Sequence, residues 1–450
     1  MAAMNSKHGE LRVLMFPWLA HGHVFPFLEL AKGLVKKHFH VYLCSTSINL
    51  DSVRNSLNND NDGHIPIELV ELPLPSLPDL PPHYHTTKNI PPHLMPTLMK
   101  AFQMSAPAFS GIIADVKPDL LIYDGFQPWA ARAAAAQGIP PVLFCTSGST
   151  SLAFFHHHHT HKSWDTFPSD AIRLKEHEKR AMIAIKVENV DDGDFIFGIF
   201  KLSCEIVLIK SYRAFEGKYM DYLSSLCERK LVPTGPLIAH GDDEGVDDQD
   251  LEMMRWLGER EEGSTLYISF GSENYVSKEQ MVEIAKGLEV SGVNFIWVAR
   301  SPVGDDAAVP EGRREKGVVV RGWAPQAAIL GHRSVGGFMT HCGWSSVTES
   351  VYYGVPMVAV AFKADQPVNA RLAVEAGIGV EVERGEDGGF DGEGVARAIN
   401  EVFVEGREGF RRRVGELREK MKVEEEEAMN QVVEELSRIS NKGRRQYTKD

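Results

Sequence analysis

The stretch Trp323–Gln366, WAPQAAILGHRSVGGFMTHCGWSSVTESVYYGVPMVAVAFKADQ, carries the pattern that decides the fold. It predicts a buried strand over Gly336–Met339 and a helix over Trp344–Tyr353, which Gly354 ends. A second apolar strand follows over Pro356–Val360. Two strands joined by a helix form a parallel β-α-β unit, and the glycine-flanked turn before the helix leaves backbone N–H groups open to a ligand.

The same alternation of strands and helices continues on the N-terminal side of this stretch. In the first part of the chain, apolar runs predict a helix at Phe27–Lys37 and buried strands at Arg12–Trp18, His40–Thr46, Asp119–Asp124 and Pro141–Thr146. Closer to the stretch they predict a helix at Ser277–Gly292, opened by a Ser277/Gln280 capping box, and strands at Thr265–Phe270, Phe295–Ala299 and Gly317–Val320. This alternation is typical of an α/β fold in which helices cover both faces of parallel sheets.

The chain divides into two such α/β series. At 450 residues it is too long for one ordinary core. The first series stops before Ile238–Asp250, a run rich in Gly and Asp with little to bury. We therefore expect an N-terminal domain over residues 1–237, a linker over residues 238–250 and a C-terminal domain over residues 251–450. The two doubly wound domains should face each other across a cleft, and the charged helical stretch Gly409–Ser440 should pack back on the N-terminal domain.

Composition and charge exclude several classes of protein. The formal net charge of −14 argues against a protein that binds nucleic acid by neutralising phosphates. The five cysteines are scattered and form no CxxC pair, which predicts neither a disulfide framework nor a zinc site. No signal peptide is recognisable, and no run reaches the roughly 18 apolar residues that a membrane helix needs. We expect a cytoplasmic monomer that binds small molecules and has no integral membrane segment.

The opening stretch also gathers side chains that suit the successive parts of a nucleotide-sugar. Trp323 offers a flat face on which a base can stack, and the turn at Ala324–Gln326 can pair with the base edge through its backbone. The N–H groups and dipole at the start of the predicted helix make an anion site for a diphosphate. His341 and Ser346 can add donors, and Gly343 lets the backbone come close.

Four more residues complete this arrangement. Glu349 lies three residues after Ser346 on the same helix face, where its carboxylate can accept both ribose hydroxyls. Asp365 and Gln366 follow the next strand and would reach the sugar hydroxyls. Ser272, in a second strand-to-glycine turn, is a candidate phosphate contact. Each residue alone also fits a structural role, such as a turn serine or a buried histidine, but their common place after strands favours a ligand site.

The stretch resembles the plant secondary-product signature of the family 1 UDP-glycosyltransferases. The similarity extends along nearly the whole chain and includes SFGS at Ser269–Ser272 and VPTGPL before the linker. It implies a GT-B fold, with a UDP-sugar as co-substrate and no cofactor. We expect no metal, because the helix start already serves the diphosphate. The resemblance implies the donor-binding residues Ser272, Trp323, Ala324, Gln326, His341, Gly343, Trp344, Ser345, Ser346, Glu349, Asp365 and Gln366.

Two departures from the family pattern fall in the donor site. Ser345 stands where the family commonly has an Asn that binds phosphate, so we expect a weaker contact rather than its loss. Val360 and Ala361 replace a frequent Trp-Pro, which should loosen the sugar end of the site.

A histidine in the N-terminal part is the candidate catalytic base. The run HGHVFP follows the strand Arg12–Trp18, and Asp124 ends another predicted strand. Histidine suits proton transfer near neutral pH, and a carboxylate can orient its ring. Both groups should lie at the carboxyl ends of parallel strands, as a base and its orienter. His21 and His23 compete for the role, and the family's GHxxP position implies that His23 is the base.

The resemblance also bears on the sugar and the acceptor. Gln366 usually accompanies UDP-glucose in this family, while UDP-rhamnose and UDP-xylose stay open. Stretches such as FPWLAHGH and DLLIYDGFQPWA resemble the branch that adds a sugar to a sugar already on an acceptor. The implied reaction is inverting transfer to a hydroxyl of a flavonoid or triterpenoid glycoside. Transfer to an aglycone hydroxyl is the alternative.

Other readings of the chain are weaker. A dinucleotide-dependent oxidoreductase would need a GxGxxG after the first strand, where Gly22 is the only glycine. A catalytically silent UDP-sugar binder would not need both His23 and Asp124.

The run His156–His159 with His161 is expected to be a solvated loop lining the acceptor pocket, because no neighbouring carboxylate or Cys spacing supports a metal site.

Overall fold

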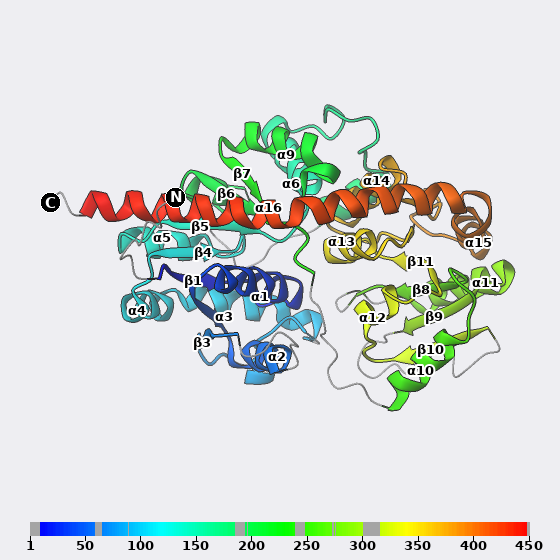
Figure 1. Cartoon of the computed structure of the whole chain (residues 1–450), viewed down its shortest axis with the longest axis horizontal. Coiled ribbons are helices and arrows are strands. Elements are labelled where there is room, and N and C mark those ends of the chain that lie inside the picture. The colour runs from blue at the N-terminus through cyan, green and yellow to red at the C-terminus, as the bar shows by residue number, and fades with distance from the viewer. Residues whose placement is uncertain are drawn as a thin grey trace, which may run out of the picture.

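The computed structural model describes residues 10–58, 65–88, 90–184, 194–195, 197–238, 248–271, 274, 276–299 and 316–447. These residues form two α/β halves, each built on a parallel sheet (Figure 1). The N-terminal half comprises the described residues up to 238, and the C-terminal half those from 248 to 406. The expected fold of two Rossmann-like α/β domains is confirmed.

The N-terminal half contains a seven-stranded parallel sheet in the order β3-β2-β1-β4-β5-β6-β7. Its strands are β1 (Arg12–Phe16), β2 (His40–Ser45), β3 (Ile67–Glu71), β4 (Leu120–Tyr123), β5 (Pro141–Cys145), β6 (Ile206–Ile209) and β7 (Lys230–Pro233). Its α-helices are α1 (His21–Lys36), α2 (Ser47–Asn58), α3 (Met95–Met104), α4 (Ala106–Val116), α5 (Pro128–Ala136), α6 (Ser149–His161), α7 (Glu176–Ala184), α8 (Ile199–Leu202) and α9 (Arg213–Cys227). Single 3₁₀ turns lie at Pro82–Tyr84 and Pro92–Leu94.

The C-terminal half contains a six-stranded parallel sheet in the order β10-β9-β8-β11-β12-β13. Its strands are β8 (Thr265–Ser269), β9 (Asn294–Ala299), β10 (Gly317–Arg321), β11 (Val335–Thr340), β12 (Met357–Ala359) and β13 (Gly379–Glu381). Its helices are α10 (Asp248–Gly258), α11 (Lys278–Ser291), α12 (Gln326–Leu330), α13 (Trp344–Tyr353), α14 (Gln366–Glu375) and α15 (Gly392–Asn400), followed by a π-helical turn at Glu401–Glu405.

Each sheet reverses its strand order once, between β1 and β4 and between β8 and β11. Open α/β sheets bind ligands beyond the carboxyl ends of the strands at such a point. The segments that follow these four strands contain His23, Asp124, Gly271 and His341. The topology therefore places these residues at the ligand-binding edges of the two sheets, before any side-chain contact is considered.

A long C-terminal helix joins the two halves. Helix α16 (Arg407–Tyr447) runs along both of them, as the red helix in Figure 1 shows. Its first part contacts α13, and its later part contacts α9, β7 and α1. Val432, Leu436 and Ile439 enter the core between α1 and the N-terminal sheet. The helix therefore packs on the N-terminal half although it follows the C-terminal half in the chain.

Several elements differ from those that the sequence predicts. Helix α1 begins at His21, not at Phe27, and contains Pro26. The apolar patterns did not predict strands β3, β6, β7 and β13. The predicted linker falls mostly on residues 239–247, which lie outside the described residues. Among the helices that the structure describes, none is both long and apolar enough to cross a membrane.

Candidate active site

A histidine and a carboxylate meet at the carboxyl ends of β1 and β4. His23 lies in the first turn of α1, and Asp124 directly follows β4 and is buried. Nδ1 of His23 lies 2.7 Å from Oδ2 of Asp124. An ionised carboxylate only accepts hydrogen bonds, so the proton of the neutral ring belongs on Nδ1. Nε2 then keeps its lone pair and can accept a proton from a substrate.

The surroundings of this pair hold the imidazole in one orientation. The backbone N–H of Trp18 donates to Oδ2 of Asp124 at 3.3 Å. The hydroxyl of Thr146, at the end of β5, lies 3.0 Å from Nδ1 of His23. The ring of Phe126 meets the His23 ring edge-on, with the centroids 5.4 Å apart. The His23 side chain is still 21% exposed, so a substrate can reach it.

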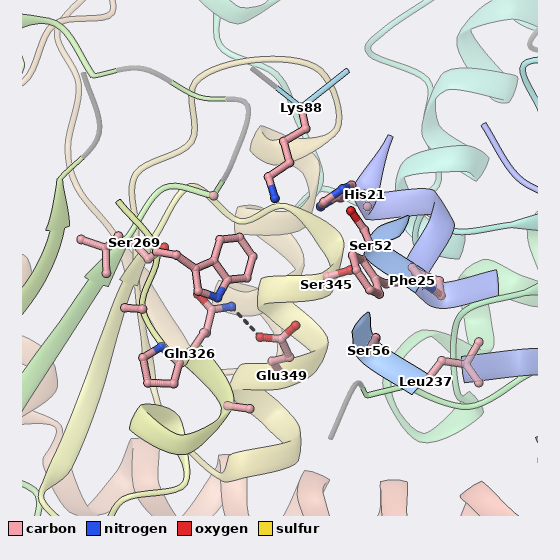
Figure 2. A pocket seen from close by; sticks show the side chains of 18 of the residues that line it. His21, Phe25, Ser52, Ser56, Lys88, Leu237, Ser269, Gln326, Ser345 and Glu349 are labelled. Atoms are coloured by element: carbon pink, nitrogen blue, oxygen red, sulfur yellow. Dashed lines mark hydrogen bonds between the residues drawn. The ribbon is translucent and has the colours of Figure 1, made fainter. Parts of the chain in front are cut away.

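A cavity lies between the two halves, next to the start of α1 (Figure 2). The N-terminal half contributes His21, Gly22, Phe25, Pro26, Ser52, Asn55, Ser56, Lys88, Lys210 and Leu237 to its lining. The facing wall comes from the C-terminal half and includes Tyr267, Ser269, Gly271, Trp323, Gln326, Ser345 and Glu349. His21, the competing histidine, thus lines this cavity, whereas His23 contacts Asp124.

Five of the expected donor residues line the cavity: Trp323, Ala324, Gln326, Ser345 and Glu349. Trp323 is 42% exposed, which is unusual for so large an aromatic side chain and makes it a candidate stacking surface on the cavity wall. Nε2 of Gln326 donates to Oε2 of Glu349 at 2.5 Å, and this contact is drawn in Figure 2. The carboxylate is thereby fixed on the cavity wall, with acceptor capacity left for hydroxyl groups.

The start of α13 forms the anion-binding end of the site. Gly343 is its N-cap and supplies no side-chain cap, so the first backbone N–H groups of the helix are open to a ligand. Ser346 lies buried in the first turn. The His341 ring packs between two glycine turns. A Cβ atom on Gly343 would lie 2.5 Å from Nε2 of His341, and one on Gly271 would lie 2.8 Å from Cε1.

Burial determines whether the His341 ring carries a charge that could attract an anion. The side chain is 8% exposed, and burial lowers its pKa to about 4, with the nearby Lys363 acting in the same direction. The ring is therefore neutral near pH 7. It can donate one N–H to a phosphate but adds no positive charge.

Asp365 and Gln366 lie at the start of α14, after β12. Burial raises the pKa of Asp365, while the hydrogen bond from Asn369 and the proximity of His23 lower it. Oε1 of Gln366 accepts the backbone N–H groups of residues 362–363 at 3.0 and 3.1 Å. The amide oxygen is therefore engaged within the protein, while the amide nitrogen donates to Oδ1 of Asn274 at 3.4 Å and keeps a second N–H for a sugar.

The side chain of Trp344 points into the interface between the halves. Its indole N–H donates to the backbone oxygen of Lys210 at 2.6 Å, and its ring stacks on Phe215. Only the backbone N–H of Trp344 can therefore contribute to binding of the UDP-sugar. Ser272, the remaining expected donor contact, lies outside the described residues.

Two lysines in the cavity were not predicted from the sequence. Lys210 directly follows β6, and its Nζ donates to Oγ of Ser345 at 2.9 Å. Nζ of Lys88 lies 5.7 Å from the centre of the Trp323 ring, and its side chain reaches into the space between the walls in Figure 2. A charged residue directly after the apolar run IVLI is a signal that could have indicated Lys210, because strand ends bear ligand sites.

The expectation of a solvated loop at the histidine run is wrong. His156–His159 and His161 form the last turns of α6. His156 and His157 are buried, and the ring nitrogens of His157 lie 2.5 Å from the Tyr222 hydroxyl and 2.9 Å from that of Thr166. The imidazoles pack on aromatic neighbours, which favours a helix over a hydrated loop. In the part of the chain that the structure describes, no group of three or more His, Cys, Asp or Glu is placed to hold a metal ion.

Comparison with family models matches almost the whole chain. The model described as "UDP-glucoronosyl and UDP-glucosyl transferase" matches residues 238–408. The model described as "Glycosyltransferase, N-terminal domain" matches residues 9–239. Together the two matches cover both sheets and the cavity between them.

Curated relatives align over nearly their full length. Mogroside IIIx synthase of Siraitia grosvenorii is 46% identical, over 96% of this chain and 99% of the relative. A β-D-glucosyl crocetin β-1,6-glucosyltransferase of Gardenia jasminoides is 44% identical, over 94% and 98%. A flavanone 7-O-glucoside 2''-O-β-L-rhamnosyltransferase of Citrus maxima is 40% identical, over 98% and 100%.

Solved structures share the fold. The Glycyrrhiza uralensis protein UGT73P12, solved with glycyrrhetinic acid 3-O-monoglucuronide, matches with a TM-score of 0.83 at 24% identity over 98% of both chains. A Polygonum tinctorium UDP-glucosyltransferase, solved with 3,4-dichloroaniline, matches with a TM-score of 0.78 at 27% identity, over 97% of this chain and 100% of the other.

Proposed function

Since this chain belongs to the family of UDP-glucuronosyl and UDP-glucosyl transferases, and is thus a UDP-glycosyltransferase, we propose that it transfers glucose from UDP-glucose to a sugar hydroxyl of a plant glycoside. The acceptor is a flavonoid or triterpenoid glycoside, and the reaction extends its sugar chain. The observation that carries the proposal is the His23–Asp124 pair at the switch point of the N-terminal sheet.

The pair acts on the acceptor hydroxyl. Nε2 of His23 takes the proton as the hydroxyl oxygen attacks the anomeric carbon of the donor. Asp124 keeps the proton on Nδ1 and stabilises the imidazolium that forms. The bond between the anomeric carbon and the β-phosphate oxygen breaks, its electron pair stays on the leaving UDP, and attack from the opposite face inverts the anomeric configuration.

The C-terminal half holds the donor. The uracil stacks on Trp323, and the ribose hydroxyls donate to Glu349, which also accepts a hydrogen bond from Gln326. The backbone N–H groups at the start of α13, with Ser345, Ser346 and the neutral His341, receive the diphosphate. Because these donors serve the diphosphate, transfer should need no metal. Activity that persists in excess chelator supports this, and activity that vanishes there and returns with Mg²⁺ contradicts it.

We propose glucose as the sugar because Gln366 usually accompanies UDP-glucose in this family. We assign the sugar contacts to the amide NH₂ of Gln366 and the carboxylate of Asp365, which also form hydrogen bonds within the protein. The three relatives named above carry printed activities or products that involve glycosides, which supports a glycoside acceptor. UDP-rhamnose or UDP-xylose as donor, and an aglycone as acceptor, are the alternatives.

A screen with paired acceptors tests the proposal. The purified chain is incubated with UDP-glucose and with aglycones beside their own monoglucosides, and products are detected by mass spectrometry. We expect one added hexose on the monoglucosides. Hexose added to aglycones alone would overturn the proposal that the acceptor is a sugar hydroxyl. Product that forms only when UDP-rhamnose or UDP-xylose replaces UDP-glucose would identify a different donor.

Three further assignments accompany this function; they concern the domains, the oligomeric state and the location of the enzyme. We propose that residues 1–237 form the acceptor domain and residues 251–450 the donor domain, with residues 238–250 as linker. We also propose that the enzyme is a monomer and acts in the cytoplasm. Light scattering of the purified chain, and microscopy of a fluorescent fusion in plant cells, test the last two.

A further inference from the structure

Lys210 is a buried cation at the meeting point of the two halves. It directly follows β6, is 2% exposed and lines the cavity. Its Nζ donates to Oγ of Ser345 on the first turn of α13. Within the described part of the chain this hydroxyl is the one hydrogen-bond partner of the ammonium group. Two of its three N–H groups are therefore left for a ligand.

Such a lysine lowers the stability of the free protein. A buried ammonium group that lacks an ion-pair partner has lost hydration without full compensation. Burial accordingly lowers the pKa of Lys210 to about 8, against the opposing effect of Glu349 and Glu29. The group is still mostly protonated near pH 7. A charge kept in a cavity at a cost in stability indicates a ligand of opposite charge.

We propose that Lys210, from the N-terminal half, binds the diphosphate of the UDP-sugar that the C-terminal half holds. This deepens the proposed function and rests on it. Ser345 marks the first turn of α13, where a diphosphate would meet the open backbone N–H groups. Because Lys210 already lies 2.9 Å from the Ser345 hydroxyl, an oxygen seated beside that hydroxyl is within reach of the ammonium group.

Ser345 can fill this role although it replaces the Asn that is common at this position in the family. A serine hydroxyl can accept the hydrogen bond from Lys210 and still donate its own proton to a phosphate oxygen. The weaker phosphate contact of a serine is thus offset by a cation that the serine positions.

Lys210 would act both in binding and in the reaction. When the bond to the anomeric carbon breaks, its electron pair passes to the β-phosphate oxygen. The fixed ammonium stabilises that charge without giving up a proton. This local charge is valuable in a protein of net charge −14, whose overall field repels a diphosphate.

The test compares UDP with uridine, which has no phosphate. Titration calorimetry measures the affinity of both for wild type, Lys210→Met and Lys210→Arg. We expect Lys210→Met to lose about 10- to 100-fold in UDP affinity, as for a charge-assisted hydrogen bond, and to bind uridine as wild type does. Lys210→Arg keeps the charge and should recover part of the affinity. Lys286→Met, which removes an exposed cation on α11, is the matched control and should change neither.

Two results overturn the inference: UDP affinity of Lys210→Met within about twofold of wild type, or equal losses for UDP and uridine, which indicate a structural role. If the methionine variant does not fold, the wild-type chain is titrated with UDP and uridine from about pH 7 to about pH 10. We then expect UDP affinity to fall above about pH 8 relative to that of uridine, and parallel profiles overturn the inference. A wild-type chain that binds no UDP would instead overturn the proposed function itself.

Discussion

The proposed chemistry depends on one hydrogen bond, between Nδ1 of His23 and Oδ2 of Asp124. It leaves Nε2 as the base and fixes the ring. His21 lies two residues earlier, at the start of the same helix, but lines the cavity instead. The sequence allowed both histidines; the difference arises because successive residues on a helix point in different directions.

His23→Ala should therefore lower kcat by about 10²- to 10⁴-fold, because the acceptor hydroxyl loses its base, while UDP affinity stays near that of wild type. Steady-state kinetics and calorimetry on the same preparation check both. His21→Ala should keep at least about a tenth of the wild-type kcat, since it removes no proton acceptor. The assignment of His23 would be wrong if the two variants behaved alike.

The pH dependence of UDP affinity should report on Lys210, whose pKa in the free protein is about 8. The protonated form attracts the diphosphate and the neutral form does not. UDP affinity should thus stay level up to about pH 8 and fall above it by up to about tenfold per unit. Glu349 and Glu29 are the charged groups that oppose this deprotonation, and His341, with a pKa of about 4, is neutral throughout.

Calorimetric titrations with UDP and uridine from about pH 7 to about pH 10 measure this profile. Uridine gives the baseline, because it carries no phosphate. A UDP profile that runs parallel to that of uridine would show that Lys210 does not contact the diphosphate.

At the scale of elements, the anion site depends on how closely two turns approach one ring. Gly271 and Gly343 both touch His341 where a Cβ would collide. The sequence predicted the strand, the glycine turn and the helix that Gly354 ends, because these are local patterns. It could not predict that the ring fills the gap between two turns, since that contact joins segments about seventy residues apart in the chain.

Gly343→Ala should lower UDP affinity by about tenfold. The backbone of Gly343, at φ −57° and ψ 145°, accepts an alanine, so the effect comes from displacing the His341 ring rather than from backbone strain. The control is Gly415→Ala in α16, where nothing lies within 4 Å of the added Cβ. The control should bind UDP normally and gain about 0.5–1 kcal/mol in stability. Normal UDP affinity in Gly343→Ala would contradict the proposed place of the diphosphate.

At the scale of the whole molecule, α16 connects the half that holds the donor to the half that holds the base. The sequence indicated two α/β series and a charged C-terminal helix. The strands β6 and β7, four residues each, were not predicted, although β4, which is equally short, was. The cavity was expected between the halves, but Lys210 could be assigned to it only once the end of β6 was placed beside the start of α13.

Leu436→Ala should lower the free energy of unfolding by about 2–5 kcal/mol, because Leu436 of α16 is fully buried in the N-terminal core. Val423→Ala on the same helix is the control. Val423 is 76% exposed, and its loss should change stability by no more than about 0.5 kcal/mol. Urea unfolding followed by circular dichroism compares them. Equal free energies of unfolding for the two variants would mean that the packing of α16 on the N-terminal half does not stabilise the protein.

The most direct test of the proposed activity is the structure of its product. The purified enzyme is supplied with UDP-glucose and a flavonoid or triterpenoid monoglucoside, and the product is analysed by two-dimensional NMR. We predict that the new glucose is linked to a hydroxyl of the existing sugar and has the β configuration, inverted from the α configuration of UDP-glucose. A new glucose on the aglycone, or one in the α configuration, would contradict the assignment of an inverting sugar-on-sugar transferase.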